Sequence, residues 1–75
     1  MAGVGKLVDK MKNQPHGITP DEADRVLRHY GYDCKRMEGS HRQYINATGD
    51  IITIVARGQL KKAYVVAILE RIGEK

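Results

Sequence analysis

The chain has 75 residues, and its 13 lysines and arginines against 9 acidic residues give a formal net charge of +4 with neutral histidines. A chain of this size buries only about 60% of the surface that its unfolded form exposes, which excludes a multidomain enzyme and a deep substrate pocket. The hydrophobic fraction of 41% excludes a disordered chain, and no apolar run approaches the roughly 20 residues that span a bilayer, so we expect one soluble domain that acts on an open face.

The first predicted element is a short helix over residues 3–12. Its apolar residues recur at the spacing that places them on one helical stripe, namely Val4, Leu7, Val8 and Met11. The segment 13–17 breaks this helix. We predict a single domain over residues 1–75, in which residues 1–18 form a helical N-terminal extension and residues 19–75 form the core.

A second helix, from Pro20 to Tyr30, has the clearest end signals in the sequence. Thr19 is its expected N-cap, and Glu22 stands where the third residue of a capping box reaches back to the cap. Gly31 supplies the left-handed stop at the other end.

After Gly31 the apolar spacing changes from about 3.6 to about 2 residues, which indicates strands. Residues 32–38 and 41–46 are predicted to form an antiparallel hairpin around a tight turn at residues 39–40. Residues 51–56 follow a second turn and have the β-branched enrichment of a central or well-buried strand.

The last predicted element is a helix over residues 60–72, whose apolar face is broad enough to cover a sheet. Because strands need one buried face, the pattern predicts an α+β fold: a two-layer sandwich of a three-stranded antiparallel sheet with helices on one face. The other face of the sheet is left for solvent or a ligand. Tyr30 and Tyr64 fall on apolar helical stripes and are expected to pack in the core. Tyr44 is a more open candidate for stacking on bases, although packing is favoured for it as well.

All of the net positive charge lies in the second half of the chain. Residues 1–34 hold five basic and five acidic residues, whereas residues 35–75 hold eight basic and four acidic ones. A basic half and a pI near 9.4 favour a polyanionic partner, with nucleic acid ahead of an acidic protein. Solubility alone is the alternative explanation of this charge.

Cys34 is the only cysteine, so no internal disulfide can form, and a reducing cytoplasm is the expected location. Its expected role is that of a small buried hydrophobe rather than a nucleophile. The cysteine and the three histidines lack the paired spacing of zinc ligands, which argues against a metal site. The sequence also lacks a glycine-rich phosphate loop followed by Lys and Ser or Thr, so nucleotide hydrolysis has no support.

The candidate catalytic feature is Gly39-Ser40-His41 at the hairpin, close in sequence to Lys35, Arg36 and Arg42. A histidine gives or takes a proton near neutral pH, so it can deprotonate a ribose 2′-hydroxyl or protonate a leaving oxygen. Neighbouring cations would balance the charge that grows on the phosphorane, and the small residues before the histidine would let a phosphate backbone come close. The alternative is an ordinary turn followed by an exposed histidine that has no function.

A second basic group lies at the start of the last helix, where Arg57 precedes Lys61 and Lys62. Cations at a helix N-terminus oppose the helix dipole, and a phosphate held there by backbone N–H groups would explain them. The alternative is a solvated helix face.

The order of these features resembles that of the HicA toxins of bacterial and archaeal toxin–antitoxin pairs. The resemblance covers residues 19–72 and rests on three stretches: Gly39-Ser40-His41-Arg42-Gln43-Tyr44, Thr48-Gly49-Asp50 with the strand after it, and Gly58-Gln59-Leu60-Lys61-Lys62 at the entry to the last helix. It implies a double-stranded-RNA-binding-domain-like fold, cleavage of mRNA that inhibits translation, and neutralisation by a HicB antitoxin. By the same resemblance His41 is the catalytic residue, with Gly39 and Ser40 as its motif partners.

We therefore predict a metal-independent, cofactor-free endoribonuclease toxin whose partners are mRNA and a HicB-like antitoxin that covers the active site, with no membrane contact. The expected RNA-binding residues are Lys35, Arg36, Gly39, Ser40, Arg42, Arg57, Lys61 and Lys62. Lys35 and Arg36 alternate on the first strand, so only one of them can share a sheet face with a given neighbour, and solubility is the expected role of the other. Many HicA toxins carry His-Pro-Gly where this chain has Ala56-Arg57-Gly58. His41 is therefore expected to act as the single proton-transfer group, with water or a basic side chain completing the cycle. The alternatives are a non-catalytic RNA-binding module and a protein-interaction domain with an acidic partner.

Overall fold

The part of the chain that the computed structural model describes, residues 3–73, contains three helices and three strands. In chain order they are α1 (Gly3–Asn13), α2 (Pro20–His29), β1 (Asp33–Glu38), β2 (His41–Ile45), β3 (Ile51–Val55) and α3 (Lys62–Arg71). This order confirms the six predicted elements, and the observed ends lie within two residues of the predicted ones. The outermost residues of the predicted domain, 1–2 and 74–75, lie outside the described part.

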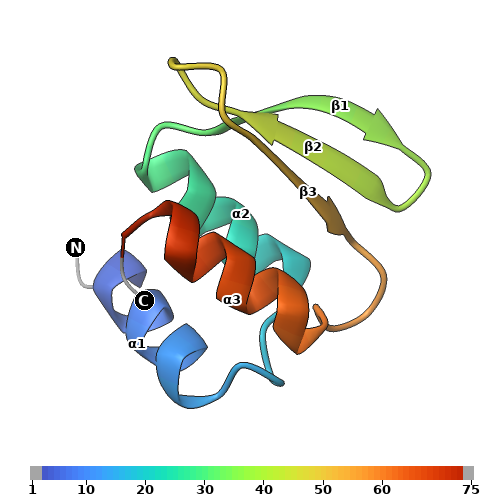
Figure 1. Cartoon of the computed structure of the whole chain (residues 1–75). Helices are drawn as coiled ribbons and strands as arrows, with labels where there is room; N and C mark the ends of the chain where they lie inside the picture. The colour runs from blue at the N-terminus through green and yellow to red at the C-terminus, as the bar shows by residue number, and fades with distance from the viewer. Residues whose placement is uncertain (1–2, 74–75) are drawn as a thin grey trace.

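The strands form one antiparallel sheet in the order β1-β2-β3, and α2 and α3 cover one of its faces (Figure 1). α1 packs against α2 and α3 on the side away from the sheet, so the helices lie in two rows (Figure 1). Within residues 3–73, the opposite face of the sheet carries no helix. The predicted α+β fold with helices on one face is confirmed, while its likeness to a double-stranded-RNA-binding domain stays a prediction.

α2 begins and ends as the sequence indicates. At its start the Thr19 hydroxyl accepts a hydrogen bond from the Glu22 N–H at 3.2 Å, and the Glu22 carboxylate accepts one from the Thr19 N–H at 3.0 Å, which completes the capping box. At its end Gly31 has a φ of 91°, and the Tyr32 N–H donates to the Leu27 carbonyl at 2.9 Å, as in a Schellman motif. Local interactions therefore set the length of α2.

α1 is part of the hydrophobic core rather than a loose extension. Met11 is fully buried and Val8 is 5% exposed. Lys10 ties α1 to the start of α2 through an ion pair with Glu22 at 2.8 Å. This hydrogen bond from Lys10 is the main reason why the pKa of the Glu22 carboxylate lies below its usual range.

α3 starts two residues later than predicted, at Lys62. Leu60 stays outside the helix because its N–H donates to the Ile18 carbonyl at 2.8 Å, a bond that joins the segments preceding α2 and α3. Leu60 is nevertheless only 3% exposed, as its place on the predicted apolar face requires. Lys61 is the N-cap residue, and its side chain makes no capping hydrogen bond.

The two faces of the sheet differ in burial. Tyr44, Ile52 and Ile54 point into the core and are 0%, 5% and 0% exposed. β3 therefore has the well-buried face that its β-branched residues predict, although it lies at an edge of the sheet rather than at its centre. Ile51, on the other face of β3, is 47% exposed.

The tyrosines only partly follow the sequence prediction. The expectation that Tyr30 packs in the core is wrong, because α2 ends at His29 and Tyr30, as the C-cap residue, turns out of the apolar stripe and is 38% exposed. Tyr44 packs in the core, as favoured, and Tyr64 is half-buried against it.

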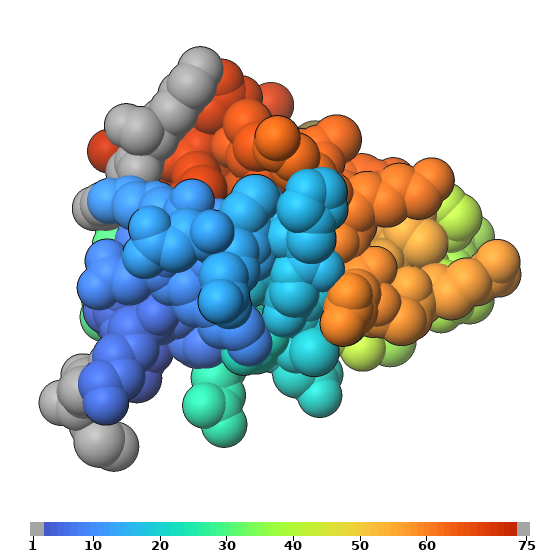
Figure 2. Space-filling model, turned by 90° about the horizontal axis from the view of Figure 1, so that it is seen from below, coloured from blue at the N-terminus to red at the C-terminus, as the bar shows by residue number. Residues whose placement is uncertain are grey.

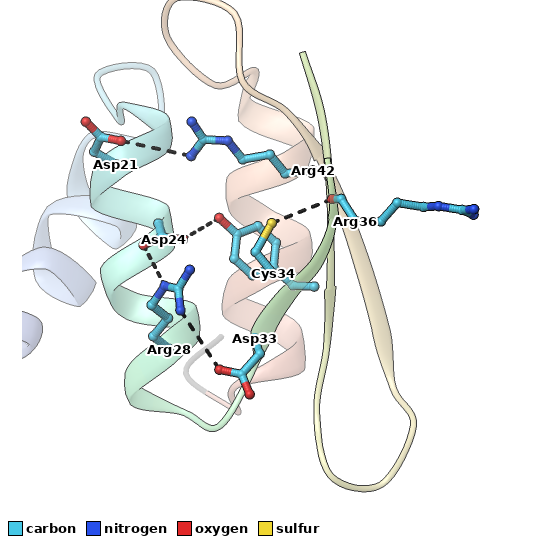
Figure 3. Close-up of polar contacts among 8 residues, drawn as sticks. Asp21, Asp24, Arg28, Asp33, Cys34, Arg36 and Arg42 are labelled. Atoms are coloured by element: carbon cyan, nitrogen blue, oxygen red, sulfur yellow. Dashed lines mark hydrogen bonds and ion pairs between the residues drawn. The ribbon is translucent and has the colours of Figure 1, made fainter. Parts of the chain in front are cut away.

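The two fully or nearly buried tyrosines each bond to an aspartate. The Tyr44 hydroxyl donates to Asp24 Oδ1 at 2.5 Å, and the Tyr32 hydroxyl donates to Asp50 Oδ2 at 2.6 Å. Each aspartate also pairs with an arginine: Asp24 with Arg28 (Figure 3) and Asp50 with Arg71. Burial, together with the bond to Asp24, raises the pKa of Tyr44 to about 12. The first bond holds β2 against α2, and the second holds the turn before β3 against the start of β1.

We predict that Tyr44→Phe lowers the free energy of unfolding at neutral pH by about 1.5–3 kcal/mol, because it removes a hydrogen bond to a charged group. The folded-state pKa of about 12 lies above the ordinary tyrosine value of 10.0, so this stabilisation is complete below pH 10 and is lost as the pH rises through 12. The difference in unfolding free energy between the wild type and Tyr44→Phe should therefore narrow over that range in urea titrations.

The matched control is Tyr30→Phe, which changes the same chemical group on an exposed side chain. It should shift the unfolding free energy by less than about 0.5 kcal/mol. A Tyr44→Phe difference that is the same at neutral pH and above pH 12 would contradict the proposed role of the Tyr44 phenol.

Candidate active site

The hairpin between β1 and β2 closes with a two-residue turn, Gly39 and Ser40, which makes Glu38 and His41 direct cross-strand partners. Gly39 has a φ of 56°, and no non-glycine residue within 3–73 has a positive φ. A glycine with positive φ at the first turn position, followed by a residue with negative φ, is typical of a type II′ turn, whose twist matches that of an antiparallel hairpin. Gly39 therefore provides the backbone conformation that sets Glu38 opposite His41.

β1 contains one residue more than the β2 segment it pairs with. This extra residue determines which side chains of β1 face the helices and which face away from them. Cys34 pairs with Tyr44 and Arg36 pairs with Gln43, so Lys35 has no partner on β2 and forms a β-bulge. In a regular strand Cys34 and Arg36, two residues apart, would share a face. The bulge places them on opposite faces, because Cys34 packs against the core and Arg36 points away from the helices (Figure 3).

On the face without helices, His41 lies in an open hollow on β1, β2 and β3. The residues that line this hollow are Arg36, Glu38, His41, Gln43 and Thr53. Arg36 Nε lies 3.8 Å from Glu38 Oε1, and the two side chains are 70% and 78% exposed. Such a loose ion pair leaves both groups accessible to a ligand. The hollow therefore presents an imidazole, a guanidinium and a carboxylate on one open surface.

Arg42 lies on the opposite face from His41, although the two are adjacent in sequence. Its side chain points toward α2, is 24% exposed and lies 3.9 Å from Asp21 (Figure 3). Lys35, the residue of the bulge, is exposed on the edge strand β1. Of the three cations that are close to His41 in sequence, only Arg36 shares its hollow.

The loop between β3 and α3 carries the second group of predicted RNA-binding residues. The Ala56 N–H donates to the Ser40 carbonyl at 2.5 Å, so this loop starts beside the hairpin turn. Figure 2 shows the loop (orange) and the hairpin (yellow-green) at one end of the molecule, remote from α1 (blue). Arg57 and Lys61 line a second hollow, and Lys62 is exposed at the first position of α3. The loop cations thus lie at the same end as His41, in a hollow of their own.

The remaining chemistry-bearing groups do not form a site of their own. Cys34 is half-buried and packs against the core, which fits a small hydrophobe. Within residues 3–73, no three His, Cys, Asp or Glu side chains gather as they would around a metal ion. None of the helices in that range has both the length and the apolar character needed to cross a bilayer.

Sequence reasoning did not identify Glu38, Gln43 and Thr53, which complete the hollow around His41. A two-residue turn implies that Glu38 lies opposite His41, and Gln43, two residues further along the strand, shares its face. Thr53 could be found only from the register of β3, in which it pairs with Gln43.

The hollow around His41 lies within the part of the chain that matches a known family. A family model described as the HicA toxin of bacterial toxin–antitoxin matches residues 20–74, from the first residue of α2 to beyond the end of α3. No curated protein and no solved structure matches the chain. The match covers more than half of the chain and includes all three strands, while α1 lies before it.

We predict that Gly39→Ala lowers the free energy of unfolding by about 1–2 kcal/mol, because a residue with a Cβ is strained at a φ of 56°. A Cβ built at Gly39 meets no atom beyond its two chain neighbours within 4 Å, so the cost lies in the backbone conformation rather than in a clash. Gly17→Ala, at a glycine without a positive φ, is the control and should cost less than about 0.5 kcal/mol. Equal stability of Gly39→Ala and Gly17→Ala in urea unfolding would argue against the type II′ turn.

Proposed function

The chain belongs to the HicA toxin family of bacterial toxin–antitoxin systems, and we propose that this toxin cuts mRNA as a metal-independent endoribonuclease in which His41 transfers a proton. The family match supports a toxin and implies a cognate antitoxin as its partner. The cleavage chemistry is inferred from the residues around His41.

The observation that carries this proposal is the position of His41 beside Arg36 in an open hollow. A phosphodiester that enters the hollow would meet an imidazole and a guanidinium together, and a guanidinium binds phosphate through paired N–H donors. Gln43 and Thr53 add neutral hydrogen-bonding groups to the same surface. Because the hollow is open, a continuous strand of RNA can cross it without having to enter an enclosed pocket.

The reaction that fits these groups is attack of a ribose 2′-oxygen on the neighbouring phosphorus. The bond from phosphorus to the 5′-oxygen breaks, and the products are a 2′,3′-cyclic phosphate and a free 5′-hydroxyl. One proton leaves the 2′-hydroxyl and one is taken up by the 5′-oxygen. His41 can perform one of these transfers, which typically contributes about 10²–10⁴-fold to a rate, and Arg36 can stabilise the charge on the phosphorane.

The loop before α3 extends this surface. The bond between Ala56 and Ser40 keeps Arg57 and Lys61 at the hairpin end of the sheet, where they can hold phosphates that flank the cleaved one. Lys35 and Lys62 are exposed and would add charge that attracts RNA. Arg42 points toward α2 and lies 3.9 Å from Asp21, so it is left out of the proposed RNA surface.

The antitoxin that the family implies is proposed to be HicB-like and to cover this same surface. An open face has no lid that could be shut, so a partner that lies over His41 is the simplest means of inhibition. The cations around the hairpin end, at Arg36, Arg57 and Lys61, would favour an acidic covering surface.

We predict that His41→Ala lowers the rate of mRNA cleavage at saturating protein by at least about 100-fold, because it removes a proton-transfer group. The measurement is cleavage of a mixed mRNA in EDTA, with the ends of the products identified. RNA binding by the same samples should change by less than about threefold, since the lysines and arginines at the hairpin end supply most of the charge that holds RNA.

His29→Ala is the matched control, because His29 is exposed at the end of α2 and lies outside the hollow. It should cleave at the wild-type rate. Cleavage by His41→Ala at that rate would remove His41 from the mechanism. Binding of RNA without cleavage by the wild type would instead favour a non-catalytic RNA-binding module.

A further inference from the structure

A carboxylate directly faces His41 across the hairpin. Glu38 and His41 form the last pair of β1 and β2 before the turn, and both line the same hollow. Directly opposed residues on one face of an antiparallel pair have Cβ atoms about 4.5–5.5 Å apart. The two-residue turn at Gly39 fixes this pairing, because a glycine with a φ of 56° sets the hairpin register. A carboxylate and an imidazole are therefore held next to each other on the open face of the hairpin, where both can face a phosphodiester that binds in the hollow.

Glu38 would be an unfavourable residue at this place if the surface only bound RNA, since a carboxylate repels phosphate. Its ion pair with Arg36 is loose, at 3.8 Å between two largely exposed side chains. A phosphate that takes Arg36 as its ligand would free the Glu38 carboxylate beside the reacting ribose. The β-bulge at Lys35 is what places Arg36 on this face, so the cation and the carboxylate come to the hollow together.

We propose that Glu38 is the general base of the cleavage reaction and that protonated His41 is its general acid. The Glu38 carboxylate takes the proton of the 2′-hydroxyl as the 2′-oxygen bonds to phosphorus. The His41 imidazolium gives its proton to the 5′-oxygen as the bond from phosphorus to that oxygen breaks. After the products leave, Glu38 returns its proton to water and His41 takes one up, which restores the starting state.

The two roles follow from the ordinary chemistry of the two side chains. A carboxylate is normally ionised at neutral pH and can accept a proton, whereas an imidazole carries a transferable proton near neutrality. This inference rests on the proposed ribonuclease activity and completes it, because cleavage through a cyclic phosphate needs a base as well as an acid. Water or a basic side chain is then no longer required as the second proton-transfer group.

The experiment compares Glu38→Gln and His41→Ala on two oligoribonucleotides of one sequence. One carries the natural 5′-oxygen at a single cleavable ribose, and the other carries a bridging 5′-sulfur there. A thiolate leaves without being protonated, so the second substrate needs a base but no acid. Rates are measured at saturating protein, and binding is measured with the 2′-deoxy version of the same oligonucleotide, which lacks the attacking hydroxyl.

We expect Glu38→Gln to lower the rate at least about 100-fold on both substrates, and His41→Ala to lower it on the oxygen substrate alone. Binding of the 2′-deoxy oligonucleotide should be retained by both variants. Asp33→Asn is the matched control, because it makes the same change of charge at the other end of β1, outside the hollow, and should leave both rates within about twofold of wild type.

Wild-type rates for Glu38→Gln, with His41→Ala inactive on the oxygen substrate, would overturn the inference and leave the proposed function intact. Recovery of Glu38→Gln on the sulfur substrate would also overturn it, because Glu38 would then be the acid. Absence of cleavage by the wild type would instead overturn the proposed function, on which the inference rests. Glutamine keeps the size of the side chain, and urea unfolding of each variant checks that it is folded.

Discussion

Strands send alternate side chains to opposite faces of a sheet, and in a protein this small the helices can bury only one of those faces. α2 and α3 cover the face of the sheet that holds Tyr44 and Ile54. The alternate residues of each strand therefore lie on the uncovered face. His41 and Gln43 are exposed or half-exposed for this reason, while Arg42 and Tyr44 turn toward α2. The stability of the fold and the chemistry of the hollow therefore occupy the two sides of the same three strands.

Much of the fold could be predicted because its signals are local. The capping box at Thr19 and the glycine stop at Gly31 define α2 within a few residues, and a change of apolar spacing marks the strands. The prediction that Tyr30 packs in the core is wrong because the apolar spacing of the helix continues to Tyr30, whereas the helix itself ends at His29. The start of α3 was missed because Leu60 is held by the Ile18 carbonyl, a contact that no local pattern contains.

The candidate site was predictable only in part, for a related reason. His41 and its turn are recognisable in the sequence, and so is a surplus of cations near them. Lys35, Arg36 and Arg42 are all close to His41 in sequence, so each is a candidate phosphate ligand beside it. Only Arg36 lines the hollow. Alternation and the β-bulge separate these three residues. The bulge depends on how β1 pairs with β2, which the spacing of apolar residues in β1 does not reveal.

Several acidic residues of the described chain pair with basic or hydroxyl groups of the helices and the sheet. These pairs determine where unpaired positive charge remains on the surface. Glu22 pairs with Lys10, Asp24 with Arg28 and Tyr44, and Asp21 with Arg42. These three acidic groups of the first half are thus matched by basic or hydroxyl partners inside the fold. Within the hollow Arg36 is paired with Glu38, so the surplus of cations at the hairpin end comes from the residues around it, Lys35, Arg57, Lys61 and Lys62.

The β-bulge also sets where β1 can change its length. Removal of Lys35 would leave Cys34 and Arg36 as neighbours in a regular strand, still on opposite faces and still opposite Tyr44 and Gln43. Removal of Met37 or Glu38 would instead shift Arg36 opposite Arg42 and send its charged side chain to the face that the helices cover. Lys35 and Arg36 are therefore the positions in this strand at which a one-residue deletion leaves the other side chains on their faces, and only the deletion of Lys35 also keeps Arg36 in the hollow.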